Sequence, residues 1–353
     1  MIVIEEKLYI ENTHFVCFFL VPQNQLYCMT AETTLCIGDV IANKYRVVSL
    51  LGRGTYGEVV AAQPPTGPRV AIKKVTFDLM HENLFIVFRE ISILRSIDHP
   101  NIISLTHVIT PKSCDYILLV TELCQGGDLR KFVKATFPNR KVSSTMISVI
   151  LEQLANAVAY LHNHQILHRD IKLQNIFCQY IGPETLEIKL GDFGLAKNVE
   201  KRSFTKNNIV PMTHEIVTLW YRAPEVLLCS DSYDEGVDLW SIGVVLVELF
   251  SGANPFNGRS EYETLIKIFR LIETPRIETW PELGQMDFYS DKFPIWSGKH
   301  RFERIVNLAP EVPEYLHRLA MDLLEMNPKN RIPARKILDR LVANPPVPKR
   351  IKQ

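Results

Sequence analysis

The chain has 353 residues, and 46% of them are hydrophobic, so it contains enough apolar material for one large domain or two lobes. The 40 Lys and Arg residues nearly balance the 39 Asp and Glu residues, which excludes an overall charge that would attract nucleic acid or an anionic membrane. The seven cysteines include no Cys-x-x-Cys pair, which favours a reducing compartment over a disulfide framework. We therefore expect an intracellular protein, in the nucleus, the cytoplasm or both, with no direct nucleic-acid ligand and no membrane contact.

An apolar run near the beginning of the chain, residues 15–21, ends at Pro22. It is shorter than the ~20 residues of a membrane-spanning helix. The residues before it include Glu5 and Glu11 in place of the basic region of a secretory signal peptide. We expect the run to form a strand or an interface segment within an N-terminal extension, residues 1–42.

The pattern of apolar residues changes along the chain from strand-like to helical. Short β-branched runs separated by turn residues predict antiparallel strands between residues 45 and 74, and another short strand at 117–120. Helical spacing occupies residues 82–97 and dominates from about Ser143, and Asp128 is placed to cap a helix after a glycine pair. The sequence therefore predicts an α+β protein with two lobes. The expected parts are a small β-rich N-lobe at about 43–121, a hinge at about 122–127, a larger helical C-lobe at about 128–345 and a basic tail at 346–353.

A glycine-rich pattern, Gly-x-Gly-x-x-Gly, occupies residues 52–57. Dinucleotide-binding folds use the same pattern, but there a helix begins at the third glycine, whereas the residues after Gly57 continue as strands. Glycine lets backbone amides approach phosphate oxygens without an intervening side chain. The loop therefore predicts a phosphate-binding flap, with an ordinary glycine hairpin as the alternative for the pattern taken alone.

Lys73 ends a Val-Ala-Ile-Lys strand, where a lysine taken alone more often points to solvent. Glu90 lies three residues after Val87 and four before Leu94, so helical geometry places its carboxylate on an apolar face. A charge on an apolar face needs a partner. An ion pair between Glu90 and Lys73 would hold the ammonium group against the α- and β-phosphates of a nucleotide.

Two motifs carry the residue types of phosphate transfer. Residues 168–175 read His-Arg-Asp-Ile-Lys-Leu-Gln-Asn, and Asp-Phe-Gly begins at Asp192 after a short alternating strand. Asp170 can accept or orient the proton of a substrate hydroxyl, and Lys172 can neutralise charge on the transferring phosphate. Asn175 and Asp192 offer the hard oxygen ligands that magnesium prefers.

These motifs, in this order, resemble those of the eukaryotic protein kinases over about residues 43–345. The resemblance implies transfer of the γ-phosphate of Mg-ATP, and Lys172 together with Thr218 resembles the serine/threonine branch. It also implies that the glycine-rich loop, the neighbouring strands and the hinge bind ATP. The ATP-binding residues so implied are Leu51, Gly52, Arg53, Gly54, Thr55, Tyr56, Gly57, Glu58, Val59, Ala71, Lys73, Glu122 and Cys124.

The segment at residues 213–225, Thr-His-Glu-Ile-Val-Thr-Leu-Trp-Tyr-Arg-Ala-Pro-Glu, resembles the activation segment of cyclin-dependent kinases. Residues 254–258 and 268–275 resemble an insert that this group shares with the mitogen-activated kinases. A kinase of the mitogen-activated type is therefore an alternative. Those kinases carry Thr-x-Tyr in the activation segment, whereas Glu215 takes the place of the tyrosine here.

The resemblance implies that Thr213 is an activating phosphorylation site for an upstream kinase, with Arg89, Arg169 and Lys197 around its phosphate. Such a phosphate brings about two negative charges and three acceptor oxygens, which can order a loop among basic groups. The third basic residue is usually an arginine in this group. Lys197 offers a point charge in place of a bidentate fork.

Other residues match family positions that concern specificity, inhibition or structure. Arg222 resembles the support of a pocket for proline after the target residue, so the expected substrates are proteins with Ser-Pro or Thr-Pro sites. Thr55 and Tyr56 match a pair of inhibitory phosphorylation sites, with ordinary loop residues as the alternative. The residues that match structural positions are the ion pair of Glu225 with Arg331 and the backbone anchor Asp238.

Five consecutive apolar residues at 84–88 cover more than one face of the predicted helix, so some must point away from the sheet. An exposed apolar patch of this kind usually marks a binding surface. We expect a cyclin-like regulatory subunit to bind there, and the alternative is a covering by residues 1–42 of the same chain. A pseudokinase scaffold is a further alternative, although it predicts the loss of a catalytic residue and none is replaced.

Overall fold

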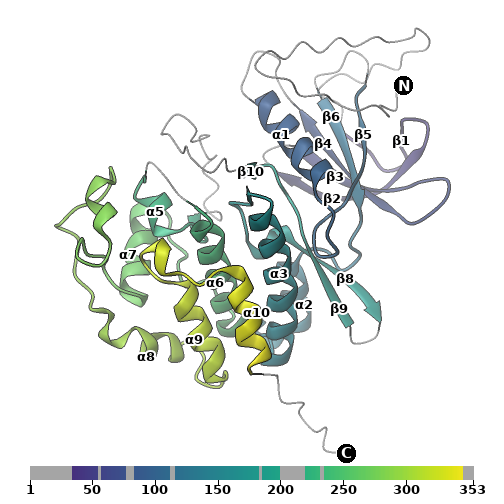
Figure 1. Ribbon diagram of the computed structural model, residues 1–353. Coiled ribbons are helices and arrows are strands. Elements are labelled where there is room, and N and C mark those ends of the chain that lie inside the picture. The colour runs from purple at the N-terminus through teal and green to yellow at the C-terminus, as the bar shows by residue number, and fades with distance from the viewer. Residues whose placement is uncertain are drawn as a thin grey trace, which may run out of the picture. The chain divides into compact units, whose positions relative to one another are not determined.

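The computed structural model describes residues 34–54, 57–76, 83–111, 116–182, 185–198, 219–230 and 234–344 (Figure 1). The chain divides into two compact units. One runs to Ile97 and resumes over Ile103–Leu123, and the other comprises Asp98–Ile102 and the chain from Cys124 onward. The first unit is β-rich and the second is mainly helical, as the expected α+β fold requires (Figure 1).

The first unit is built on one six-stranded antiparallel sheet with the strand order β1-β2-β3-β4-β6-β5. Its helix α1, Asn83–Ser96, agrees with the helix expected at residues 82–97. β-branched residues make up most of β4, in keeping with its pleated, half-buried surroundings. The strands are β1 (Val40–Ile41), β2 (Tyr45–Gly54), β3 (Gly57–Gln63), β4 (Val70–Thr76), β5 (Leu105–Ile109) and β6 (Tyr116–Glu122).

The two faces of this sheet bury different sets of residues. On one face, Val87 and Ile91 of α1 pack with Val75, Ile117 and Leu119. Alternate residues of a strand point to opposite sides, so the other face of the sheet carries a different set of side chains. This face is apolar too. Its cluster comprises Leu35, Ile41, Tyr45, Val47, Val60, Ala62, Ile72, Tyr116, Leu118 and Val120.

The second unit is organised around two buried helices, α3 (Ser144–Asn163) and α6 (Gly236–Ser251). By length and composition, α3 is the one helix among the described residues that could cross a membrane, but its apolar side packs on α6, α10 and β9 as a core helix does. Asp128 caps α2 by accepting from the backbone N–H of Lys131 at 2.9 Å, as expected. The remaining helices are α2 (Leu129–Thr136), α5 (Pro224–Leu227), α7 (Glu261–Leu271), α8 (Arg301–Val306), α9 (Glu314–Leu323) and α10 (Ala334–Val342).

Two short antiparallel pairs and several 3-10 turns complete this unit. Strand β7 (Ile166–Leu167) pairs with β10 (Lys197–Asn198), and β8 (Ile176–Gly182) pairs with β9 (Thr185–Leu190). Along the chain, β7 and β8 flank residues 168–175, and β9 and β10 flank Asp192. The 3-10 turns are Pro138–Arg140, Leu173–Asn175, Pro281–Gln285, Gly298–His300 and Pro328–Asn330.

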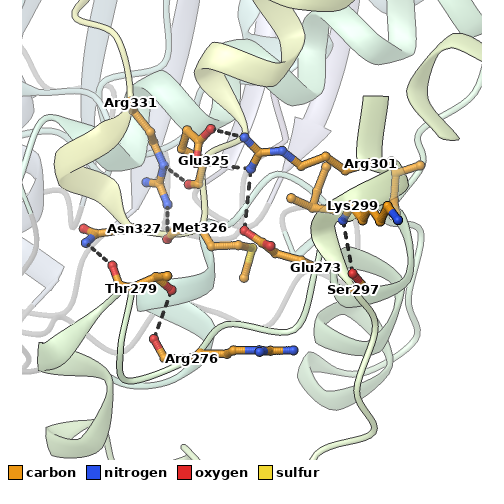
Figure 2. Close-up of polar contacts among 12 residues, drawn as sticks. Glu273, Arg276, Thr279, Ser297, Lys299, Arg301, Glu325, Met326, Asn327 and Arg331 are labelled. Atoms are coloured by element: carbon orange, nitrogen blue, oxygen red, sulfur yellow. Dashed lines mark hydrogen bonds and ion pairs between the residues drawn. The ribbon is translucent and has the colours of Figure 1, made fainter. Parts of the chain in front are cut away.

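A buried ion pair joins α5 to the segment before α10. The guanidinium of Arg331 contacts the carboxylate of Glu225 through two nitrogen–oxygen distances of 2.6 and 2.8 Å, and both side chains are almost fully buried. Arg331 also donates to the backbone oxygens of Glu325 and Met326 (Figure 2). The pair that the family resemblance implied is therefore present and fully hydrogen-bonded.

Replacing Arg331 by Met leaves the Glu225 carboxylate buried without its cation. Removal of one partner of a buried pair costs about 3–5 kcal/mol of unfolding free energy. Denaturant titration followed by circular dichroism measures this loss. The matched control is Arg318→Met, because Arg318 and its partner Glu314 are both exposed and such a pair contributes about 0–1 kcal/mol. Equal losses in the two variants would contradict the assignment of Arg331.

Candidate active site

The glycine-rich hairpin is formed by β2 and β3, and Arg53 faces Glu58 while Gly54 faces Gly57. Gly57 has a φ of +133°, and a Cβ there would lie 1.8 Å from the backbone oxygen of Lys74. No other residue type fits this position, so the glycine lets the hairpin approach β4 closely. The chain continues as a strand after Gly57, which excludes the helix of a dinucleotide-binding turn.

Lys73 and Glu90 form an ion pair inside the first unit. Lys73 Nζ lies 2.9 Å from Glu90 Oε1 and 3.3 Å from Oε2. The alternation of β4 buries Ile72 on one face and turns Lys73 to the other, where α1 presents Glu90. The Glu90 side chain is 6% exposed and the Lys73 side chain 21%, so the pair is shielded on the carboxylate side and open on the ammonium side.

The other expected nucleotide-binding residues are distributed over both units. Ala71 pairs with Thr121 across β4 and β6, and Glu122 exchanges hydrogen bonds with Ser104 at 2.8 and 3.2 Å. Cys124 is buried and belongs to the second unit. Leu51, Gly52 and Arg53 lie on β2, and Gly57, Glu58 and Val59 lie on β3.

The catalytic loop of the second unit is held by one fully buried carboxylate, that of Asp238 on α6. Asp238 accepts from the backbone N–H groups of His168 at 2.9 Å and Arg169 at 2.8 Å, and its Oδ2 lies 3.0 Å from Nε2 of His162. Burial works against the charge, yet the contacts with His162 and His168 hold the pKa of Asp238 below its ordinary value. The carboxylate is thus ionised and fixes a loop in which Arg169 has a φ of +65°.

Asp170 is buried and its Oδ2 is fixed by two neighbours. Lys172 Nζ lies 2.8 Å from it, and the side-chain amide of Asn175 donates to it at 2.8 Å and to the backbone oxygen of Asp170 at 2.8 Å. Burial raises the pKa of Asp170 above its ordinary value, Lys172 opposes this, and Asp192 adds to it. A carboxylate with a raised pKa and a fixed orientation is suited to take a proton from a hydroxyl.

Asn175 and Asp192 are brought together by the backbone. The N–H of Gly191 donates to the backbone oxygen of Asn175 at 2.8 Å, and the backbone oxygen of Gly191 lies 3.0 Å from His168 Nε2. Asp192 follows directly with a φ of +61°. The side-chain amide nitrogen of Asn175 donates to Asp170, so its side-chain oxygen Oδ1 is left as the atom that can bind a metal ion. An amide oxygen and a carboxylate are hard donors that suit a divalent cation such as Mg²⁺.

Arg222 is buried beside the beginning of α7. Its Nη1 lies 3.4 Å from Glu261 Oε1, and its side chain is 7% exposed. Among the described residues, no hydrogen-bond partner reaches its Nε and Nη2 atoms. Burial lowers the pKa of Arg222, whereas Glu261 and the more distant Asp170 raise it. Arg222 is therefore a buried cation within electrostatic range of the catalytic carboxylate.

The expected regulatory residues are only partly within the described residues. Arg89 lies on α1 in the first unit, and Lys197 lies on β10, paired with Leu167. Arg169 donates from Nε to the backbone oxygen of Leu195 at 2.6 Å. Four expected site residues lie outside the described residues, namely Thr55, Tyr56, Thr213 and Thr218.

A model of the protein kinase domain matches residues 45–342. This match covers most of the chain and includes both units, so the chain belongs to the protein kinase family. The predicted two-lobed α+β fold is thereby confirmed, with a curled sheet in the first lobe and helices in the second. Membership of this family makes the protein an ATP-dependent protein kinase.

Two residues that sequence reasoning did not assign contribute to the site. His162, on α3, contacts the anchor Asp238, and Glu261 supplies a countercharge to Arg222. No motif marks either residue. The helical periodicity of buried positions on α3 places His162 toward the core, but this pattern does not identify its partner.

Replacing Glu90 by Gln removes the charge that holds the Lys73 ammonium group. We expect kcat/KM for ATP to fall about tenfold or more, equivalent to ~1.4 kcal/mol of transition-state stabilisation. Steady-state kinetics with varied ATP checks this. The control is Glu152→Gln on an exposed position of α3, which should leave kcat/KM unchanged. An unchanged value for Glu90→Gln would exclude a functional ion pair.

Replacing Asp238 by Asn leaves one acceptor oxygen for two backbone N–H donors, so the catalytic loop loses a hydrogen bond. We expect kcat to fall about tenfold or more while KM for ATP changes less than about threefold, because the loss acts on the reacting groups. The control is Glu235→Gln, since Glu235 is half exposed and lies 3.7 Å from the same His162. If Asp238→Asn changed only KM, this would argue against Asp238 as the residue that holds the catalytic loop.

Proposed function

We propose that the protein is a serine/threonine kinase of the cyclin-dependent type, which transfers the γ-phosphate of Mg-ATP to Ser-Pro or Thr-Pro sites in proteins. The observation that supports this best is the 2.8 Å contact between Lys172 Nζ and Asp170 Oδ2. Lys172 occupies the space next to Asp170, the proposed base. In this space we expect the short hydroxyl of serine or threonine to reach Asp170 more readily than the phenol of tyrosine. The motif spacing of Asp170 and Lys172 favours the same branch.

The residues divide the chemistry between them. The oxygen of the substrate hydroxyl bonds to the γ-phosphorus, the bond from that phosphorus to ADP breaks, and Asp170 receives the hydroxyl proton. Lys172 neutralises charge on the transferring group, and Lys73, held by Glu90, orients the α- and β-phosphates. Bound magnesium would neutralise further charge on the phosphates.

The preference for proline rests on Arg222. The Arg222 guanidinium is buried and paired with Glu261, so it has a fixed position and can form one side of a binding pocket. Its position in a sequence that resembles the activation segment of cyclin-dependent kinases supports a pocket next to the target residue. The pocket would accept a proline ring, which has no N–H to leave unpaired.

Activation and inhibition are proposed on the same resemblance. Phosphorylation of Thr213 by an upstream kinase would order the activation segment through Arg89, Arg169 and Lys197, and phosphorylation of Thr55 or Tyr56 would inhibit. We propose on the same resemblance that the protein acts in the control of cell division or transcription, in the nucleus, the cytoplasm or both.

A cyclin-like subunit is the proposed partner of α1. Val87 and Ile91 pack on the sheet, whereas Phe88 is 45% exposed and Ile86 is partly exposed. The described part of the extension packs on the opposite face of the sheet, with Leu35 in the other cluster. The exposed Phe88 supports a partner in trans. The apolar run at residues 15–21, on which a covering in cis depends, lies outside the described residues.

The test compares three peptides that differ at the target and following residues: Ser-Pro, Ser-Ala and Tyr-Pro. We expect the activated kinase, phosphorylated at Thr213 and bound to its partner, to favour Ser-Pro over Ser-Ala by about tenfold in kcat/KM and to leave Tyr-Pro unmodified. Glu261→Gln should reduce the ratio of Ser-Pro to Ser-Ala, while Glu263→Gln on the same helix should not. Asp192→Asn must abolish transfer, since a residual signal would come from a contaminating kinase. Equal use of the tyrosine peptide would overturn the proposal.

A further inference from the structure

A buried carboxylate lies near the tip of the glycine-rich hairpin. Glu58, the second residue of β3, is 8% exposed. Its Oε1 accepts from the backbone N–H of Leu35 at 2.7 Å, and its Oε2 lies 3.9 Å from Nε of Arg53. The family resemblance groups Glu58 with the ATP-binding residues, but this carboxylate is directed at the N-terminal segment.

The donor of this hydrogen bond lies outside the part of the chain that the kinase family model matches, which begins at residue 45. Leu35 is nevertheless 6% exposed and packs in the apolar cluster of the sheet. Backbone hydrogen bonds fix the segment on β2, from Gly38 to Val47 at 2.9 Å and from Val47 to Asp39 at 2.8 Å. The N–H of Leu35 is therefore a fixed donor, not a mobile one.

The position of Glu58 makes this contact relevant to the phosphate-binding loop. Arg53 and Glu58 are directly paired, and the next pair, Gly54 with Gly57, is the last of the hairpin. β3 is held at this end by β4, through Gly57 with Val75 and Glu58 with Lys74, whereas β1 reaches only Tyr45 and Arg46 of β2. Among the described strands, the glycine-rich end of β2 is therefore paired with β3 alone. A buried hydrogen bond to Glu58, one pair from the tip, restrains this end of the hairpin, because loss of the acceptor would leave the Leu35 N–H buried and unpaired.

We propose that Glu58 is a positioning residue for nucleotide binding, which ties the glycine-rich hairpin to the segment preceding the kinase domain through the Leu35 N–H. The affinity for the nucleotide phosphates then depends on Leu35, a residue outside the matched domain. This inference rests on the assignment of the protein as an ATP-dependent kinase. Glu58 acts through the hairpin backbone and touches no reacting atom.

Direct binding of Mg-ADP and of adenosine to the full-length protein, measured by isothermal titration calorimetry, tests the proposal. Glu58→Met keeps the length of the side chain and removes the acceptor, whereas Glu58→Gln keeps an acceptor oxygen for Leu35. We expect Glu58→Met to weaken Mg-ADP about tenfold and adenosine less than about twofold, since adenosine has no phosphates. Glu58→Gln should bind Mg-ADP within about threefold of the wild type.

Leu35→Ala provides a second variant that leaves the hairpin sequence intact and decides the matter if Glu58→Met does not fold. It removes the packing that fixes the donor and should weaken Mg-ADP more than adenosine. The matched control is Asp39→Asn, because the Asp39 carboxylate accepts from Cys36 within the same segment at 2.7 Å. This variant should bind both ligands as the wild type does.

Several results would overturn the inference. Equal weakening of Mg-ADP and adenosine would indicate a general loss of structure, and tighter binding of Mg-ADP to Glu58→Met would show that the carboxylate acts by repulsion. If both Glu58→Met and Leu35→Ala bound Mg-ADP with wild-type affinity, the contact between Leu35 and Glu58 would have no role in nucleotide binding. If the wild type itself bound neither ligand, the kinase assignment would fail together with this inference. If the wild type binds Mg-ADP, a failure of the Glu58 inference leaves the kinase assignment intact.

Discussion

The arrangement of the second lobe depends on one constraint, the complete burial of the Asp238 carboxylate. A buried charge is tolerated when donors surround it, and here the donors are two backbone N–H groups of the catalytic loop and the ring of His162. The need to satisfy the carboxylate thus determines where the loop runs. Asp170, Lys172 and Asn175 then follow at fixed spacings, and both Lys172 and Asn175 contact Oδ2 of Asp170.

Local signals in the sequence were sufficient for most of the fold. The helix expected at 82–97 is α1 at Asn83–Ser96, the strand at 117–120 is the centre of β6, and Asp128 caps α2. Each depends on neighbours within a few residues, where periodicity and capping are strong. Glu90 was predictable for the same reason, since its place on an apolar helix face demanded a cation.

The contacts that sequence reasoning missed join residues far apart in the chain. His162 reaches Asp238 across 76 positions, Arg222 reaches Glu261 across 39, and Leu35 reaches Glu58 across 23. Periodicity indicates that such side chains face inward but not which partner they meet. The regulatory assignments at Thr213, Thr55 and Tyr56 lie outside the described residues and stay predictions.

The ion pair of Glu225 with Arg331 has a consequence for biosynthesis. The two residues are 106 positions apart, and Arg331 lies close to the end of the matched domain. While the chain emerges from the ribosome, Glu225 therefore remains without its cation until nearly the whole domain has been made. The second lobe therefore completes its packing late in translation, because Glu225 stays unpaired while the 106 positions up to Arg331 are synthesised.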